Sequence, residues 1–201
     1  MKLKSLFLIF LLFIIYFIFS SISYSSTISN DLENNLFRLR IIANSNSEED
    51  QNLKLQVRNN ILNYLNQFSF KTKNETISHL QNSKSDIEEV ISKTIEENGF
   101  NYTYEYEITN SFYPLKYYNS ITLPSGNYDG LQIKLGKAKG KNWWCILFPP
   151  MCLINSSTCT LEEEKNTISE SNLSTESTKI IQSNQSSYKI KFKIVDFINN
   201  L

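Results

Sequence analysis

The pattern of apolar and polar positions along the chain predicts an apolar leader, two helical segments and several strands. Residues 6–19 are apolar or aromatic without a single charge, and Lys2 and Lys4 precede them. A basic start followed by such an apolar run is typical of an export signal. We therefore expect residues 1–25 to take the chain out of the cytoplasm, as a signal peptide or as an N-terminal membrane anchor.

Both forms of this leader stay open on the sequence. At a rise of about 1.5 Å per residue, the apolar run is somewhat short for the roughly 30 Å of bilayer hydrocarbon. Small residues at Ser21 and Ser23, or at Ser23 and Ser25, resemble the sites that signal peptidases cleave. This match favours cleavage, and an uncleaved anchor is the alternative.

Residues 37–43 predict the first strand of the domain. Phe37, Leu39, Ile41 and Ala43 alternate with other residues, so one face of this strand should lie in the core. Arg38 and Arg40 fall on the opposite face, which we expect to be exposed to solvent.

Two helical patterns follow this strand. Ser47, with Asp50 three residues later, has the pattern of an N-cap with a capping-box acid. The apolar residues that then share one helical face are Leu53, Val57, Ile61, Leu62 and Leu65. A second helical pattern over residues 77–95 is interrupted at 82–85 and closes at Asn98-Gly99, a good C-terminal cap.

The remaining apolar patterns predict a sheet. Residues 100–108 alternate between an aromatic and a polar face, and residues 131–135 and 188–195 alternate in the same way. Residues 143–148 form a fully apolar run. Helical and strand patterns within one domain make α+β the expected fold class. We expect one compact domain with a mixed or antiparallel sheet and two or three helices, after the N-terminal export segment.

Composition sets the limits of this domain. The globular part should span residues 31–154, because residues 155–187 are rich in Ser, Thr, Asn and Glu and read as a flexible polar loop. Residues 188–201 should return to the domain as a C-terminal strand. About 170 residues remain without the leader, which suits a single core.

Charge and motif content exclude several function classes. Lys plus Arg and Asp plus Glu number 20 each, so the formal net charge is zero and we expect no nucleic-acid partner. The single histidine, His79, has no apparent nucleophile partner, and the three cysteines lack the spacing of a zinc site. No phosphate-binding loop occurs. We therefore expect no enzyme, no metal, no cofactor and no small-molecule substrate.

The most distinctive segment is Gly136 to Cys152, GKAKGKNWWCILFPPMC. Trp143 and Trp144 are adjacent, so in a strand their side chains point to opposite faces. Outside the cytoplasm Cys145 and Cys152 tend to oxidise, and the intervening Pro-Pro could bring them together as a disulfide. Two small buried thiols are the alternative, and Cys159 is left without a pairing partner in either case.

Three blocks of this sequence resemble the stage II sporulation protein R family of endospore-forming Firmicutes. The first is RLRIIANSNS at residues 38–47, followed by Glu49-Asp50-Gln51 and the helix behind it. The second joins FYPLKYY at 112–118 to LPSGNY at 123–128, with Tyr118 where a glycine would be more familiar. The third is GKNWWCILFPPMC at 140–152, whose N-W-W-C-x-x-F-P-P-x-C string is the most specific.

The resemblance implies a developmental signal that acts by binding and not by catalysis. Proteins of this family are made in the forespore and exported into the space between forespore and mother cell. There they trigger a membrane-embedded aspartic protease of the mother cell, which matures sigma-E. The residues that we expect to contact this partner are Arg38, Arg40, Asn44, Asp50, Trp143 and Trp144, although Asn44 and Asp50 could instead only cap the helix.

Two other classes remain as alternatives. A secreted hydrolase of unknown type would need His79 or a pair of acids. An envelope or cell-wall binding module would use exposed aromatic residues of the strand at 100–108 or of the tryptophan motif.

Overall fold

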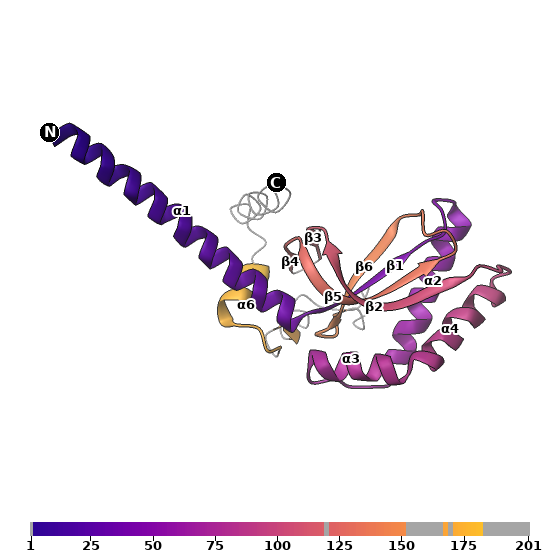
Figure 1. The fold of residues 1–201 in the computed structure, drawn as a ribbon. Helices are drawn as coiled ribbons and strands as arrows, with labels where there is room; N and C mark the ends of the chain where they lie inside the picture. The colour runs from indigo at the N-terminus through magenta and orange to yellow at the C-terminus, as the bar shows by residue number, and fades with distance from the viewer. Residues whose placement is uncertain (1, 119–120, 152–166, 169–170, 183–201) are drawn as a thin grey trace.

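A four-stranded mixed sheet forms the centre of the fold (Figure 1). The computed structural model describes residues 2–118, 121–151, 167–168 and 171–182. The strand order is β2-β5-β1-β6, in which β1 (Phe37–Ile42) pairs in parallel with β5 (Gly126–Leu135). The outer strands β2 (Tyr104–Tyr113) and β6 (Asn142–Phe148) are antiparallel to their neighbours. The mixed sheet confirms the predicted α+β class.

Three helices cover one face of this sheet, namely α2 (Glu48–Leu65), α3 (Lys73–Asn82) and α4 (Lys84–Glu97). Their apolar sides pack against the sheet residues that the alternation predicted. The sheet residues that are fully or almost fully buried in this core are Phe37, Leu39, Ile41, Leu131, Ile133, Leu135 and Leu147. The aromatic side of residues 100–108 packs against the same core as predicted, although the strand itself begins only at Tyr104 and continues to Tyr113.

Local sequence signals set the helix ends as expected. The Ser47 hydroxyl accepts the Asp50 backbone N–H at 3.2 Å and so caps α2. The second helical pattern is interrupted as predicted, because Ser83 separates α3 from α4. Gly99 has φ +77°, and Phe100 N–H donates to the Ile95 carbonyl at 3.1 Å to close α4.

The opposite face of the sheet is covered as well. The cover comprises the end of α1 (Lys2–Asn35), the small sheet of β3 (Lys116–Tyr117) and β4 (Thr122–Leu123), and α6 (Thr175–Gln182). The buried apolar residues of this second cluster are Ile28, Leu32, Leu36, Tyr113, Ile121, Leu123, Tyr128, Ile146, Ile168, Ile180 and Ile181. The domain therefore has a core on each side of its sheet.

This second cover corrects the expectation for Arg38. The side chain was expected on a solvent-exposed face, but it is 0% exposed. The alternation of residues 37–43 predicts the apolar face correctly. It cannot predict that elements from distant parts of the chain cover the other face, on which Arg38 lies. Arg40, near the end of the strand, is half-buried.

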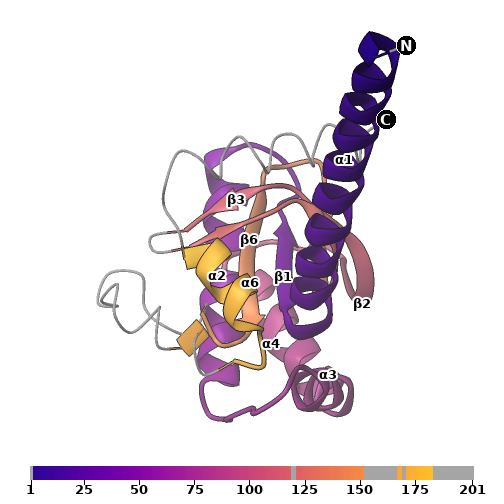
Figure 2. The same ribbon diagram turned by 90° about the vertical axis from the view of Figure 1, so that its left-hand side faces the viewer.

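The stretch expected to be a flexible loop contains a helix. Residues 175–182 form α6, which lies beside the C-terminal part of α1 (Figure 2). Ser177, Ile180 and Ile181 are its buried residues. The low overall hydrophobicity of the stretch concealed these residues, so the loop prediction was wrong for this segment. The predicted strand at 188–195 lies outside the described residues.

The leader is the first part of α1, a helix that leaves the domain as a rod (Figure 1). Within it, residues 5–35 are long and apolar enough to cross a membrane, and the apolar window is not buried against the protein. An export signal and an anchor both fit this finding. The helix continues past residue 25, where the leader was expected to end, and Ile28 and Leu32 lie in the second core.

Candidate functional site

The turn from β1 to α2 is held by a pair of predicted site residues. The side-chain amide of Asn44 donates to the Asp50 carboxylate at 2.8 Å. The Asn44 side-chain oxygen in turn accepts the Lys137 backbone N–H at 2.9 Å. A Cβ on Gly136, whose φ is +55°, would lie 2.5 Å from that Asn44 oxygen. The structure therefore brings Asn44 and Asp50 together and joins them to the loop between β5 and β6.

Asp50 has a structural place in this turn. Burial alone would raise the pKa of its carboxyl group, but hydrogen bonds from Ser45, Asn44 and Tyr102 outweigh that effect and lower the pKa below 3.8. The side chain is 3% exposed. The predicted capping-box contact of Asp50 is not made, because the Ser47 backbone N–H donates to the Ser45 hydroxyl at 3.1 Å and the Asp50 carboxylate accepts from Asn44. Asp50 thus stabilises the junction in its ionised form and presents little surface to a partner.

Arg38 lies inside a group of tyrosines beneath the second cover. Its guanidinium carbon is 4.7 Å from the centre of the Tyr113 ring and 5.2 Å from that of Tyr128. The Arg38 Nε–H donates to the Cys145 carbonyl at 3.1 Å, and one Nη donates to the Tyr118 hydroxyl at 3.0 Å. Tyr118, the departure from the expected glycine, thus bonds a buried cation. A direct contact of Arg38 with a partner does not fit this burial.

The tryptophans stand on opposite faces of β6, as predicted. Trp143 packs against the helix-covered core, whereas Trp144 packs with the second cluster. Each carries an arginine on its ring: Arg58 of α2 lies 4.1 Å from the ring centre of Trp143, and Arg40 of β1 lies 4.7 Å from that of Trp144. Two arginine–tryptophan stacks therefore flank the first residues of β6.

Arg58 belongs to a group of cations that the sequence did not single out. The Lys54 ammonium, one helical turn earlier, donates to the Gln51 side chain at 2.6 Å and to the Lys141 carbonyl at 3.0 Å. Lys54 is 5% exposed. Burial lowers the pKa of Lys54 most, and the positive charges of Arg58 and Lys141 lower it further. Lys54 and Arg58 belong to the helix of the first block that resembles the family, but their approach to β6 depends on helix packing and could not be predicted from that block.

The cysteines are placed only in part. Cys145 lies in the core at 9% exposure. Cys152 and Cys159 are outside the described residues. The pairing of Cys145 with Cys152 therefore stays a prediction.

His79 lies in an aromatic environment on α3. Its ring centre is 4.1 Å from that of Phe68 and 5.1 Å from that of Phe70. The ring nitrogen is 3.3 Å from the Ser83 hydroxyl. Burial lowers the pKa of His79, although the charge of Asp86 acts in the opposite direction.

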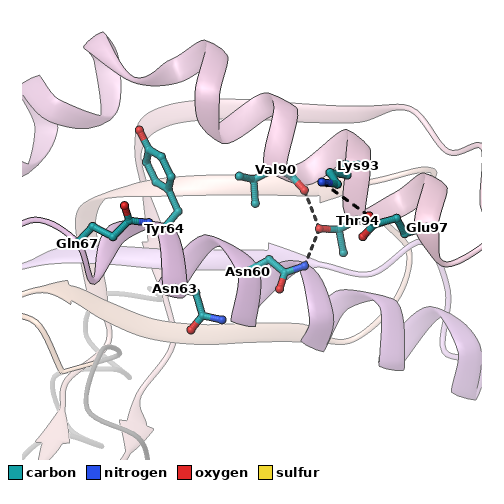
Figure 3. A pocket seen from close by; sticks show the side chains of 8 residues that line it. All are labelled: Asn60, Asn63, Tyr64, Gln67, Val90, Lys93, Thr94 and Glu97. Atoms are coloured by element: carbon teal, nitrogen blue, oxygen red, sulfur yellow. Dashed lines mark hydrogen bonds and ion pairs between the residues drawn. The ribbon is translucent and has the colours of Figure 1, made fainter.

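A polar groove lies between α2 and α4 (Figure 3). Its volume is about 370 Å³, and its lining consists of Asn60, Asn63, Tyr64, Gln67, Val90, Lys93, Thr94 and Glu97. The Asn60 amide donates to the Thr94 hydroxyl at 2.9 Å, which in turn donates to the Val90 carbonyl at 2.6 Å. None of the predicted site residues lines this groove. Over the described ranges, no group of three or more His, Cys, Asp or Glu side chains could hold a metal ion.

Comparison with known proteins gives one consistent result. Residues 33–158 match the family model described as stage II sporulation protein R. A curated relative, the stage II sporulation protein R of Bacillus subtilis (strain 168), is 32% identical over 122 residues. The match covers 60% of this chain and 54% of the relative, so the chain matches about half of the relative's length. No solved structure matches.

Proposed function

Since the chain belongs to the stage II sporulation protein R family, we propose that it is an exported forespore protein that triggers processing of pro-sigma-E. In this proposal it enters the space between forespore and mother cell, where it acts on a membrane-embedded aspartic protease of the mother cell. The family match over residues 33–158 carries the proposal, because it includes the whole sheet and the three helices that cover it.

We further propose that the protein acts by binding. A ligand shifts a two-state equilibrium only when it binds one state more tightly than the other. The domain would therefore bind the active state of the protease better than its inactive state. The apolar leader, which fits an export signal or an anchor, supports this role.

The proposed contact residues fall into two groups. Arg40, Trp143 and Trp144 are half-buried, so a partner can reach part of each side chain. Arg38 and Asp50 are buried and would act only by holding the surrounding structure. Asn44 is half-buried, but both ends of its amide are already bonded.

The alternative of a cell-wall binding module loses one of its proposed surfaces. The aromatic side chains of β2 face the core, where the Tyr106 hydroxyl donates to the Leu80 carbonyl at 2.9 Å and the Tyr104 hydroxyl to the Glu88 carbonyl at 3.2 Å. They are therefore poor platforms for a glycan. Co-sedimentation of the purified domain with peptidoglycan would favour this alternative over a protease ligand.

Reconstitution in a bacterium that does not sporulate tests the proposal. The protease and pro-sigma-E are produced together, with or without the full-length chain. We expect processed sigma-E only when the chain is present and exported. A protease variant that lacks a catalytic aspartate should abolish processing, which excludes proteolysis by the chain itself. Equal processing without the chain, or processing that persists with the protease variant, would contradict the proposed function.

A further inference from the structure

We propose that the two arginine–tryptophan stacks around the start of β6 form the docking surface for an acidic protein segment. This inference rests on the proposed function, and it identifies the chemistry that the partner presents. The surface, here called the cation–tryptophan surface, consists of Arg58, Lys141 and Trp143 on one side of β6, supported by the buried Lys54, and of Arg40 and Trp144 on the other.

The charge of this surface is not balanced within the described structure. The ion pairs among the described residues join acids to Lys73, Lys84, Lys93 and Lys134. None of these pairs involves a cation of the cation–tryptophan surface. Asp50, four residues before Lys54, is the nearest acid along α2, but its carboxylate accepts the Asn44 amide at 2.8 Å and no ion pair joins it to Lys54 among the described residues. The chain as a whole is neutral, so this gathering of cations is a local property.

Burial of Lys54 makes this imbalance costly. Lysine is almost never this deeply buried without an ionic partner. Here only a side-chain amide and a backbone carbonyl receive its protons, while Arg58 and Lys141 repel its charge. The fold gains no ion pair from this arrangement. Carboxylates that a partner places on Arg58 and Lys141 would offset the repulsion that these two cations exert on Lys54.

The arginines are held in fixed orientations. Arg58 lies against the Trp143 ring and donates through Nε and Nη2 to the Asn59 side-chain oxygen at 2.9 and 2.7 Å. Arg40 donates to the side chains of Asn142 and Gln132 at 3.3 and 3.0 Å. A fixed guanidinium recognises a carboxylate with directed hydrogen bonds at a low cost in side-chain entropy.

These features favour an acidic protein segment over an anionic lipid surface. Lipid attraction by basic segments is a diffuse effect that needs no fixed orientation, and insertion needs exposed apolar side chains. The large apolar residues that are exposed in the described chain lie on α1 or at Phe68, Phe112 and Tyr117. None belongs to the cation–tryptophan surface.

The position of the surface suits a partner that lies away from the leader. Trp143 is paired with Ile41 and Asn142 with Ile42, so β6 begins at the end of β1 that is remote from α1. Figure 1 places α1 and this end of β1 on opposite sides of the domain. The cation–tryptophan surface therefore lies away from the point where α1 joins the domain.

Binding of the full-length chain to the detergent-solubilised protease tests the inference. We expect Arg58→Glu and Lys141→Glu each to weaken binding at least tenfold, and raised salt to weaken binding of the unchanged chain. Lys71→Glu, an equal charge change at an exposed residue in the α2–α3 connection, is the matched control and should bind normally. Lys141→Glu is needed because Arg58→Glu removes a packed ring contact, whereas the Lys141 side chain is exposed.

The outcomes separate the inference from the proposed function. Normal binding by folded Arg58→Glu and Lys141→Glu proteins overturns the docking surface and leaves the proposed function intact. Failure of the unchanged chain to bind contradicts the proposed function itself. A third arm uses vesicles of phosphatidylglycerol: variants that lose vesicle binding but keep the protease would overturn the acidic-segment proposal in favour of a lipid surface.

Discussion

Asn44 and Asp50 are joined by a hydrogen bond of 2.8 Å that closes the turn between the first strand and the second helix. The same Asn44 side chain receives the backbone N–H of Lys137 from a loop 93 residues away. One amide therefore ties three segments of the domain together. Arg58 of the cation–tryptophan surface lies on the helix that starts at this junction.

Removal of the Asp50 charge should lower stability in a pH-dependent way. The pKa of Asp50 is lowered in the folded protein, so its ionised form contributes stability that is fully present above about pH 4, the pKa of an unfolded aspartate. This contribution is lost as pH falls through the folded pKa. We expect Asp50→Asn to cost about 1 to 3 kcal/mol at pH 7 and the difference to shrink below pH 4. Urea unfolding of both proteins at pH 7 and pH 3 measures this difference in the free energy of unfolding. An equal difference at the two pH values would contradict a stabilising role of the ionised Asp50 carboxylate.

Arg38 and Arg40 should respond differently to the same substitution. Arg38→Gln leaves the Cys145 carbonyl and the Tyr118 hydroxyl without their buried partner, so we expect a loss of about 3 kcal/mol in the free energy of unfolding. Arg40→Gln, at a half-buried position, should cost no more than about 1 kcal/mol but reduce sigma-E maturation. Denaturant unfolding and a processing assay together check this. A folded, stable Arg38→Gln protein would show that the buried cation is dispensable.

The proposed disulfide between Cys145 and Cys152 gives a third prediction. The pairing is a prediction from the sequence, since Cys152 lies outside the described residues. Closing so short a loop stabilises a domain by roughly 2 kcal/mol, or about 4–8 °C in Tm for a domain of this size. We expect a reducing agent to lower the Tm of the oxidised protein by that amount. The Cys145→Ser, Cys152→Ser protein should not respond to the reducing agent, and an unchanged Tm relative to the oxidised chain would mean that no bridge forms.

Cleavage of the leader is a fourth prediction. The small residues favour processing after Ser23 or Ser25, so the exported protein should begin at Tyr24 or Ser26. Either product keeps Ile28, Leu32 and Leu36, which cover the second core. N-terminal sequencing and intact mass decide the matter. A membrane-bound product that retains residues 1–23 would instead identify α1 as a lasting anchor.

Local signals predicted much of this fold. The Ser47 cap, the cap at Gly99, the break before Ser83 and the alternation of residues 37–43 depend on neighbours within a few residues, so the sequence displays them directly. The opposite orientation of Trp143 and Trp144 follows from strand geometry alone.

Long-range packing accounts for what the sequence did not reveal. Arg38 is buried because α1, β3, β4 and α6 cover a face that strand alternation marks as polar. Helix α6 owes its place to Ile180 and Ile181 within an otherwise polar stretch. Arg58 reaches Trp143 only because α2 crosses the sheet at that point. The contacts of Arg38 with Tyr118 and of Arg58 with Trp143 join residues that are at least 80 positions apart in the sequence. The place of α6 depends on how that helix packs, which no local pattern specifies.

Sigma-E maturation by an exported or a retained form of the chain tests the central claim most directly. Deletion of residues 5–22 removes the apolar run but keeps the part of α1 that packs on the domain. Produced in the forespore, this form should leave pro-sigma-E unprocessed, and fusion to an unrelated cleavable export signal should restore processing. Normal maturation by the form that stays inside the producing cell would contradict the account.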